Sequence, residues 1–331
     1  MKVRPLNTLA LRIRLRAEGK VNSSRVHRLA RNEVAHVPYP EFNSVERINA
    51  EIFVEIHPYA LIGHQVSSWI AGYLWSKELG IDYAGGSLSR DTDGFFDFSS
   101  HESRALEDVK VVRLKAVGDE RDLRSLRDLQ RQVARAQRKY PDRALSFRLA
   151  LDPARWDQTK AQDETRKAVL SGSRGNDLRT AETEAPYAAI HIRRGRDIST
   201  NHISAGVNRW VVEDDYVALI KQLRGIPELH DLEIRIYSLG EAHEFQRLEE
   251  AGAVLYLGGS RDSDLIALSA AKILVLSPSS FSFTAALISR SVVLGRIPWW
   301  HHVPGEGRWV HISPDWTFDT TTVSRALTVG R

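Results

Sequence analysis

Apolar residues along the first half of the chain follow the spacing of alternating strands and helices. A short apolar run at residues 52–56 predicts a strand, and apolar residues at helical spacing over 66–79 predict a helix that Gly80 ends. A second strand is expected at 81–84, just before two glycines. Strand, helix and strand in this order are typical of a parallel α/β layer. The same reasoning predicts two later strands at residues 109–114 and 145–151. A charged, exposed helix is expected between them at residues 122–139.

The second half of the chain alternates between strand and helix patterns with few interruptions. Its predicted strands lie at residues 188–192, 232–237, 254–257, 273–276 and 292–294. Its predicted helices lie at residues 215–223, 241–250, 264–271 and 281–289. Strict alternation of this kind predicts a doubly wound parallel sheet, in which ligands bind at the carboxyl ends of the strands.

A polar stretch that contains glycine and serine separates the two halves at residues 171–185. We place a domain boundary there, so that residues 1–180 form an N-terminal α/β domain and residues 181–331 form a C-terminal one. The length of 331 residues agrees with this division, because one hydrophobic core stops growing at about 250–300 residues. The expected fold class is therefore α/β with two Rossmann-like domains.

Composition narrows the classes of protein to which the chain can belong. Hydrophobic residues make up 42% and charged residues 27%, which is ordinary for a globular protein. The absence of cysteine excludes disulfides, thiolate metal sites and a cysteine nucleophile. No apolar run reaches the roughly 18 residues of a membrane span, and arginines interrupt the N-terminal region, so we expect a cytoplasmic protein without a span or signal peptide. The net charge is only +4 and no RNA- or DNA-binding signature is present, so no nucleic-acid partner is expected.

Two adjacent arginines, Arg193 and Arg194, follow the strand predicted at 188–192. A guanidinium holds phosphate oxygens through a planar pair of donors and keeps its charge at all physiological pH values. When a nucleotide sugar gives up its sugar, negative charge grows on the β-phosphate of the leaving diphosphate. An arginine fixed there stabilises the transition state more than the ground state. The alternative is a surface pair that makes salt bridges.

Other candidate ligand-binding residues lie where helices are predicted to begin. Asp264 begins the predicted helix 264–271, and Ser279 and Ser280 precede the helix predicted from 281. Serines in this position cap helices, and the same geometry directs backbone N–H groups at a phosphate. Three more candidates stand in the turn before the first predicted helix, where glycine permits close backbone approach: Gly63, His64 and Gln65.

Three blocks of the chain resemble, in order, blocks of the fucosyltransferase superfamily, which includes α1,2-, α1,6-, nodulation and protein O-fucosyltransferases. The family's N-terminal Gly-x-Gln turn and helix resembles LIGHQVSSWIAGYLWSKELGIDYAGG. Its His-x-Arg-Arg-Gly/Thr-Asp block resembles AAIHIRRGRD. Its C-terminal block of an Asp, a helix of small residues, a strand and a Ser-Ser turn resembles SDLIALSAAKILVLSPSSFSFTAALIS. The blocks span residues 51–294, and residues 87–185 between them match no block.

The resemblance implies a GT-B-like fold in which the C-terminal domain binds the nucleotide sugar and the N-terminal domain faces the acceptor. It implies GDP-fucose as the donor, a glycan or glycoside as the acceptor, and inversion at the sugar carbon without a metal or other cofactor. Arg193 would hold the β-phosphate, and Arg194 would support it. His191 would lie near the base through its backbone, Asp264 would accept the two guanine N–H donors, and Ser280 would line the phosphate or ribose end.

The chain departs from the family block at Arg196, which stands before Asp197. Asp197 is kept as a catalytic candidate, although its place in the block is shifted by one residue. Inversion also needs a general base near the acceptor hydroxyl. The candidates that the sequence offers for this base are Asp197, His202, Glu213 and Asp214.

Three alternatives stay open at this stage. One is a GT-B enzyme with a different nucleotide sugar, and another is a catalytically inactive homologue that binds GDP, which Arg196 suggests. The third concerns Asp91 and Asp93, which have the Asp-x-Asp form of metal-dependent glycosyltransferases. They also fit an ordinary Asp-Gly turn, because Gly94 follows.

Overall fold

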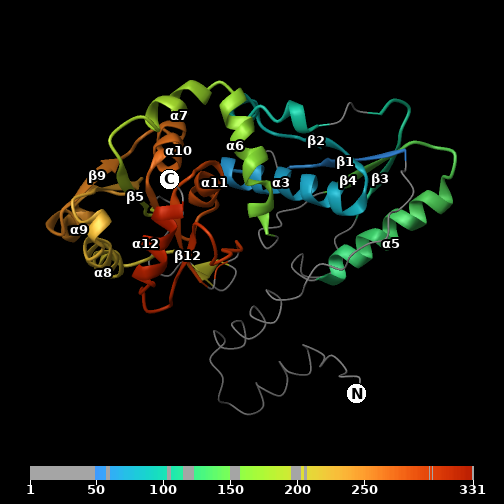
Figure 1. Ribbon diagram of the computed structural model, residues 1–331. Helices are drawn as coiled ribbons and strands as arrows, with labels where there is room; N and C mark the ends of the chain where they lie inside the picture. Colours follow the sequence, from blue (N-terminus) through green and yellow to red (C-terminus); the bar gives the residue numbers. More distant parts are fainter. Residues whose placement is uncertain are drawn as a thin grey trace, which may run out of the picture.

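The computed structural model describes residues 49–56, 60–102, 106–114, 123–149, 157–194, 203–204, 207–297, 299 and 301–329. These residues form two parallel β-sheets with helices packed on them (Figure 1), so the predicted α/β class is confirmed. No helix in these ranges combines the length and the apolar character that crossing a membrane requires.

The first sheet has four parallel strands in the order β2-β1-β4-β3. They are β1 (Ala50–Val54), β2 (Asp82–Gly86), β3 (Lys110–Arg113) and β4 (Leu145–Leu149). Helix α3 (Ile62–Leu79) joins β1 to β2, and the short helix α4 (Arg90–Phe95) follows β2. Helix α5 (Leu123–Lys139) precedes β4. The predicted unit of strand, helix and parallel strand is therefore present.

Helix α3 is buried on nearly every side because it lies between the first sheet and the second half of the molecule. Trp69 and Trp75 are fully buried on it. A Cβ atom at Gly72 would come within 2.1 Å of Val54 Cγ2, so glycine lets the helix lie close to β1. The helix ends at Gly80, which has a φ of +64° and donates its N–H to the carbonyl of Lys77.

The second sheet has six parallel strands in the order β12-β11-β10-β5-β8-β9. They are β5 (Tyr187–His191), β8 (Glu233–Ser238), β9 (Ala253–Leu257), β10 (Ile273–Val275), β11 (Val292–Arg296) and β12 (Trp309–Ile312). The chain winds outward from β5 in one direction and from β10 in the other. This order is that of a doubly wound sheet, as predicted.

Helices cover both faces of the second sheet because alternate strand residues point to opposite faces. Helices α10 (Arg261–Ala270) and α11 (Ser280–Ile288) pack on the face toward the first sheet, against residues such as Ala189 and Leu274. The helices on the other face are α8 (Glu213–Arg224), α9 (Gln246–Glu250) and α12 (Thr320–Val329). The sequence analysis did not predict β12 and α12.

The polar stretch between the halves is mostly helical rather than an open linker. It contains the end of α6 (Gln162–Ser171) and all of α7 (Gly175–Ala181), which pack on α11 and α10. The side chain of Arg166 on α6 donates to the carbonyl of Ile288 (3.0 Å) and pairs with Glu182 (2.8 Å). The polar residues here therefore bind the two halves together, and one apolar core runs through both.

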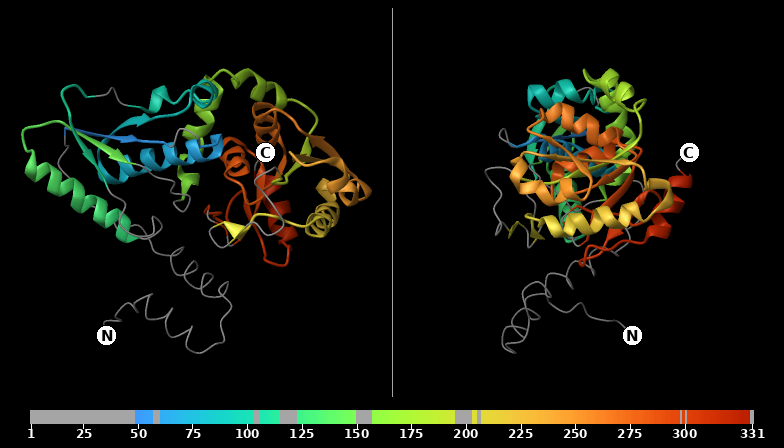
Figure 2. Two further views of the ribbon diagram at one scale, coloured as in Figure 1. Left: turned by 180° about the vertical axis from the view of Figure 1, so that it is seen from behind. Right: turned by 90° about the vertical axis from the view of Figure 1, so that its left-hand side faces the viewer.

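The two halves also meet where α3 and α11 begin. A Cβ atom at Gly63 would lie 2.6 Å from the carbonyl carbon of Ser280 and 2.7 Å from the backbone nitrogen of Phe281. Helix α11 lies next to the beginning of α3, and from there α3 extends along the first sheet (Figure 1 and Figure 2). Gly63 is thus required by the packing of one backbone against another.

We expect Gly63→Ala to destabilise the protein by about 1–3 kcal/mol, because the added methyl meets backbone atoms that cannot move aside. The matched control is Gly94→Ala in α4, where a Cβ atom would have nothing within 4 Å. That control should be neutral or slightly stabilising, because alanine favours a helix more than glycine does. Urea unfolding measures both, and equal stability of the two variants would contradict the contact.

Candidate functional site

A cavity of about 270 Å³ opens at the carboxyl ends of β5 and β10, where the winding direction of the second sheet reverses. Doubly wound sheets bind ligands at this position. Residues from both halves of the chain line the cavity. Of the residues that the sequence singled out, eight lie in its wall: Gly63, His64, His191, Arg193, Arg194, Asp264, Ser279 and Ser280.

Two other predicted residues are not placed in this wall. Gln65 is only 5% exposed and uses both ends of its carboxamide within the protein. Its Nε2 donates to the carbonyl of Ala60 (2.7 Å), and its Oε1 accepts the N–H of Ser89 (2.8 Å). Both ends of this carboxamide are therefore hydrogen-bonded within the protein near the beginning of α3. Asp197 lies outside the described residues, as do Arg196 and His202.

Three helices direct their N-termini toward the cavity. Their first residues, Ile62 of α3, Arg261 of α10 and Ser280 of α11, all line it. The N-terminus of a helix carries unpaired backbone N–H groups and a partial positive charge. Three such ends around one cavity favour an anionic ligand.

The starting point of α10 differs from the prediction. Ser260 caps the helix by accepting the N–H of Ser263 (3.1 Å), so the helix begins at Arg261. Asp264 consequently lies in the first turn rather than at the first position. Its carboxyl group still lines the cavity.

Two buried imidazoles fix the turn between β10 and α11. His191 Nδ1 lies 2.6 Å from the hydroxyl of Ser277, and His301 Nε2 lies 2.8 Å from that of Ser280. Burial, with Arg193 and Arg209 nearby, lowers the pKa of His191 to about 3. Burial also holds the pKa of His301 well below its usual value. Both rings are therefore neutral and act as hydrogen-bonding supports for the serines.

Positive charge predominates among the residues that line the cavity. Four arginines contribute to its wall, and Asp264 is the one carboxylate among the described lining residues. Arg209 lies over the turn that precedes α11, with its Nε donating to the carbonyl of Pro278 (3.2 Å). With three helix N-termini added, the cavity has an excess of positive potential that an anion with two or more charges would neutralise.

Arg194 differs from the other arginines because the protein holds its side chain. Its Nη2 donates to the carbonyl of Val211 (2.8 Å), and its Cζ lies 3.7 Å from the centre of the Trp210 ring. Its Nε lies 3.9 Å from a carboxylate oxygen of Glu244. Only 3% of the residue is exposed. The guanidinium of Arg194 is thus held in place by other groups of the protein.

Asp264 is enclosed at the opposite side of the same cavity. Gly259 leaves room for it, since a Cβ atom there would lie 2.2 Å from Asp264 Oδ1. Within the described part of the chain, the carboxylate has no hydrogen-bond donor. Burial raises the pKa of Asp264 to about 6. A half-buried carboxylate in this condition is suited to accept N–H donors from a ligand.

The remaining sequence candidates lie away from the cavity wall. Glu213 accepts the backbone N–H of Arg247 (3.3 Å), and Asp214 pairs with the guanidinium of the same residue. Asp91 and Asp93 lie in the first turn of α4, which Ser89 caps. The described residues contain no group of three or more His, Asp or Glu placed to share a metal ion.

Sequence reasoning missed two residues of the cavity wall, Arg209 and Arg261. Arg261 left a signal, because a cation in the first turn of a helix opposes the helix dipole and needs another explanation. Arg209 left none. It reaches the turn before α11 from a separate loop, and no local spacing announces such a contact.

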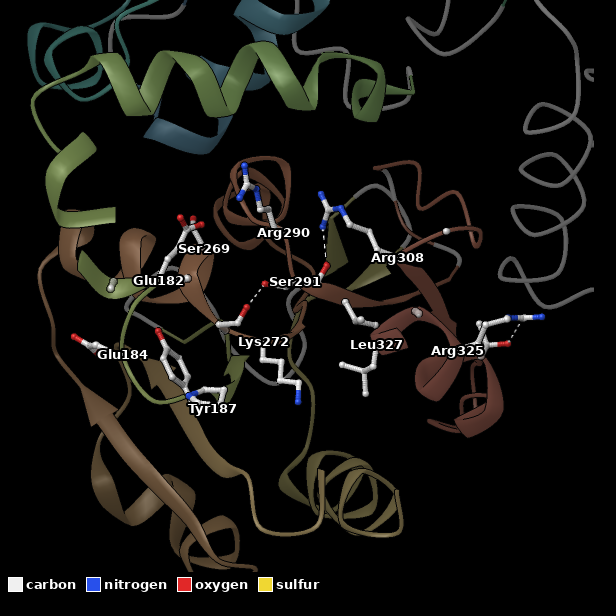
Figure 3. Close-up of a pocket in the computed structure, with 18 of the residues that line it drawn as sticks. Glu182, Glu184, Tyr187, Ser269, Lys272, Arg290, Ser291, Arg308, Arg325 and Leu327 are labelled. Atoms are coloured by element: carbon white, nitrogen blue, oxygen red, sulfur yellow. Dashed lines mark hydrogen bonds between the residues drawn. The ribbon is translucent and has the colours of Figure 1, made fainter. Parts of the chain in front are cut away.

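A second and larger cavity, of about 770 Å³, lies at the amino ends of the strands (Figure 3). Its charged groups are largely used by the protein: Arg308 donates to the carbonyls of Ser291 (3.0 Å) and Ala286 (2.7 Å). Lys272 and Arg290 follow the ends of α10 and α11, where a cation suits the helix dipole. Cavity size alone does not make this a site, so the smaller cavity is the better candidate.

Comparisons with known proteins add little to this geometry. No known protein family matches the chain, and no curated protein does. Among solved structures, the chain is similar to alpha,alpha-trehalose 6-phosphate synthase from Burkholderia multivorans at 11% identity and a TM-score of 0.32. The similarity covers 94% of this chain and 70% of the other. At this level neither the fold nor the activity of that enzyme is transferred to the present chain.

We expect Asp264→Asn to be more stable than the wild type at pH 7.5, and this gain to shrink at pH 4.5. The folded protein raises the carboxyl pKa from 3.8 to about 6, so the folded state holds this proton more tightly than the unfolded state does. Stability from this group is therefore lost as pH rises through that interval. Asparagine carries no such proton. Melting temperatures of both proteins at the two pH values measure the effect, and a pH-independent difference would contradict it.

Proposed function

We propose that the protein is an inverting glycosyltransferase that transfers fucose from GDP-fucose to a hydroxyl group of a glycan or glycoside, without a metal. One observation supports this most: helix N-termini and arginines surround a cavity at the switch point of a doubly wound sheet, and Asp264 is the one carboxylate among its described lining residues. A nucleoside diphosphate has matching chemistry, with a polyanion at one end and N–H donors at the other.

The diphosphate end would lie against α11 and Arg193. The backbone N–H groups at the beginning of α11 are donors for phosphate oxygens, and His301 holds the hydroxyl of Ser280 beside them. Arg193 would hold the β-phosphate, where charge grows as the sugar leaves, and Arg194 would keep the strand exit in place. These positive groups would stabilise the charge that develops on the leaving diphosphate, which a divalent cation does in other transferases.

The base end would lie against Asp264. A carboxylate accepts two parallel N–H bonds from the Watson–Crick edge of guanine, and adenine offers no such pair. Leu239, which is 57% exposed, also lines the cavity and offers an apolar surface for a planar base. These features favour a guanine nucleotide, in agreement with the role that the family resemblance implies.

The acceptor would approach from the first half of the chain. The two halves, each built on a parallel sheet, correspond to the two Rossmann-like domains of a GT-B-like enzyme, with the cavity between them. Of the described residues that the first half contributes to the wall, His64 is the one whose side chain can accept a proton. A neutral imidazole nitrogen accepts a proton from a hydroxyl group, so we assign His64 as the general base.

The transfer then proceeds as a single displacement. The acceptor hydroxyl gives its proton to His64 while its oxygen forms a bond to the anomeric carbon of the sugar. The bond from this carbon to the β-phosphate oxygen breaks, and its electron pair leaves with GDP. Attack opposite the leaving group inverts the configuration.

We expect GDP and GDP-fucose to raise the melting temperature of the protein, and UDP and ADP to do so much less. Asp264→Asn should weaken GDP binding by about 1–3 kcal/mol, because it loses a charged acceptor. GDP binding to the wild type should also weaken below about pH 6, as the carboxyl gains a proton. Equal stabilisation by GDP and UDP would favour a transferase with another nucleotide sugar.

We expect Arg193→Lys to lower kcat by roughly 10²–10³ with a much smaller change in GDP affinity, because lysine lacks the paired donors that follow the developing charge. Single-turnover hydrolysis of GDP-fucose, with water as the acceptor, measures the rate in the absence of a known glycan. Titration calorimetry measures the affinity. Tight GDP binding by a wild type that never cleaves GDP-fucose would identify an inactive homologue instead.

A further inference from the structure

Arg209 is a residue of the cavity wall to which the sequence analysis assigned no role. It follows β7 (Val207–Asn208), which forms a small hairpin with β6 (Ile203–Ser204). Its backbone therefore approaches the cavity from a different segment than the one that carries Arg193. Its Nε donates to the carbonyl of Pro278, two residues before the first residue of α11.

Arg193 and Arg209 both lie near His191 in the wall of the cavity. Both guanidiniums are close enough to the buried ring of His191 to lower its pKa, and both line the cavity that this ring also lines. Ser277, which is bonded to this ring, belongs to the same turn as Pro278. Two cations thus lie around one turn, at the N-terminus of α11.

This arrangement suits a ligand with two adjacent negative charges. Two guanidiniums and a helix N-terminus lie around one turn, and no described carboxylate other than Asp264 lines the cavity. A diphosphate places two adjacent anionic groups in one small volume, so both arginines can bind it at once. A monophosphate or a neutral nucleoside would satisfy one cation or none.

We infer that Arg209 is a second leaving-group arginine, which grips the diphosphate opposite Arg193. This inference rests on the proposed function for its catalytic meaning, but its binding chemistry requires only a diphosphate. When the bond between the anomeric carbon and the β-phosphate oxygen breaks, the electron pair stays on that oxygen. Arg193 and Arg209 then share the added negative charge, and no proton from the protein is needed.

The test compares Arg209→Gln with Arg290→Gln. Arg290 carries the same charge, is exposed, and lies at the opposite end of the second sheet, so its variant controls for the lost charge. Calorimetric titrations use inorganic pyrophosphate, GDP and guanosine. We expect Arg209→Gln to weaken the binding of pyrophosphate and GDP by roughly 10-fold or more and to leave the affinity for guanosine unchanged. In the control variant, the affinities for all three compounds should be unchanged. Arg209→Lys should recover part of the pyrophosphate affinity.

The outcomes separate this inference from the proposed function. If pyrophosphate binding depends on Arg209 while GDP and UDP bind equally, the inference holds and the guanine assignment is lost. If GDP binds tightly with equal affinity to the wild type and Arg209→Gln, the inference is overturned and the donor proposal stands. An equal loss for guanosine, or the absence of pyrophosphate binding by the wild type, would also overturn it. Should Arg209→Gln fail to fold, the Arg209→Lys titrations decide in the same way.

Discussion

The close contact between the beginnings of α3 and α11 is the constraint on which the rest of the site depends. The N-termini of these two helices meet at Gly63 and Ser280. Such a close approach is possible because Gly63 has no Cβ atom. This contact sets the position of the first half of the chain against the switch point of the second sheet. It places His64 and the backbone of α3 in the same cavity as the strand exits of β5 and β10. The packing of α6 and α7 on the other ends of α10 and α11 then holds the two halves together from the far side.

This packing concentrates charge of one sign, and the surrounding structure is arranged to tolerate it. Helix ends and arginines converge where only Asp264 is negative among the described lining residues. The two histidines nearest to the turn before α11 are held neutral by burial, so they add hydrogen bonds without adding charge. Arg194 is neutralised and immobilised by Glu244, Trp210 and a backbone carbonyl. The arginines and helix N-termini that line the cavity are suited to a bound polyanion.

Several parts of this arrangement could be predicted from local pattern alone. The strand β5 follows from its short apolar run, and the end of α3 follows from Gly80. The predicted first residues of the helices agree less well with the structure. Helix α3 was predicted from residue 66 but begins at Ile62, because no side chain caps it and its first turn is set by packing against α11. Helix α10 was predicted from Asp264 but begins at Arg261, and here Ser260 was a capping signal in the sequence that the apolar spacing concealed.

The sequence by itself determined the alternation of strands and helices, the absence of thiol chemistry, and the placing of Arg193, Arg194, Asp264 and the serine turn at element ends. These properties depend on residue spacing within one element, which the chain displays directly. The tertiary structure alone decided that Gly63 serves the junction of two backbones, that both ends of the Gln65 carboxamide are hydrogen-bonded within the protein, and that Arg209 and His301 join the turn before α11. Such contacts join residues from separate loops, and their geometry is fixed only when the two halves pack, so no periodic pattern along the chain records them.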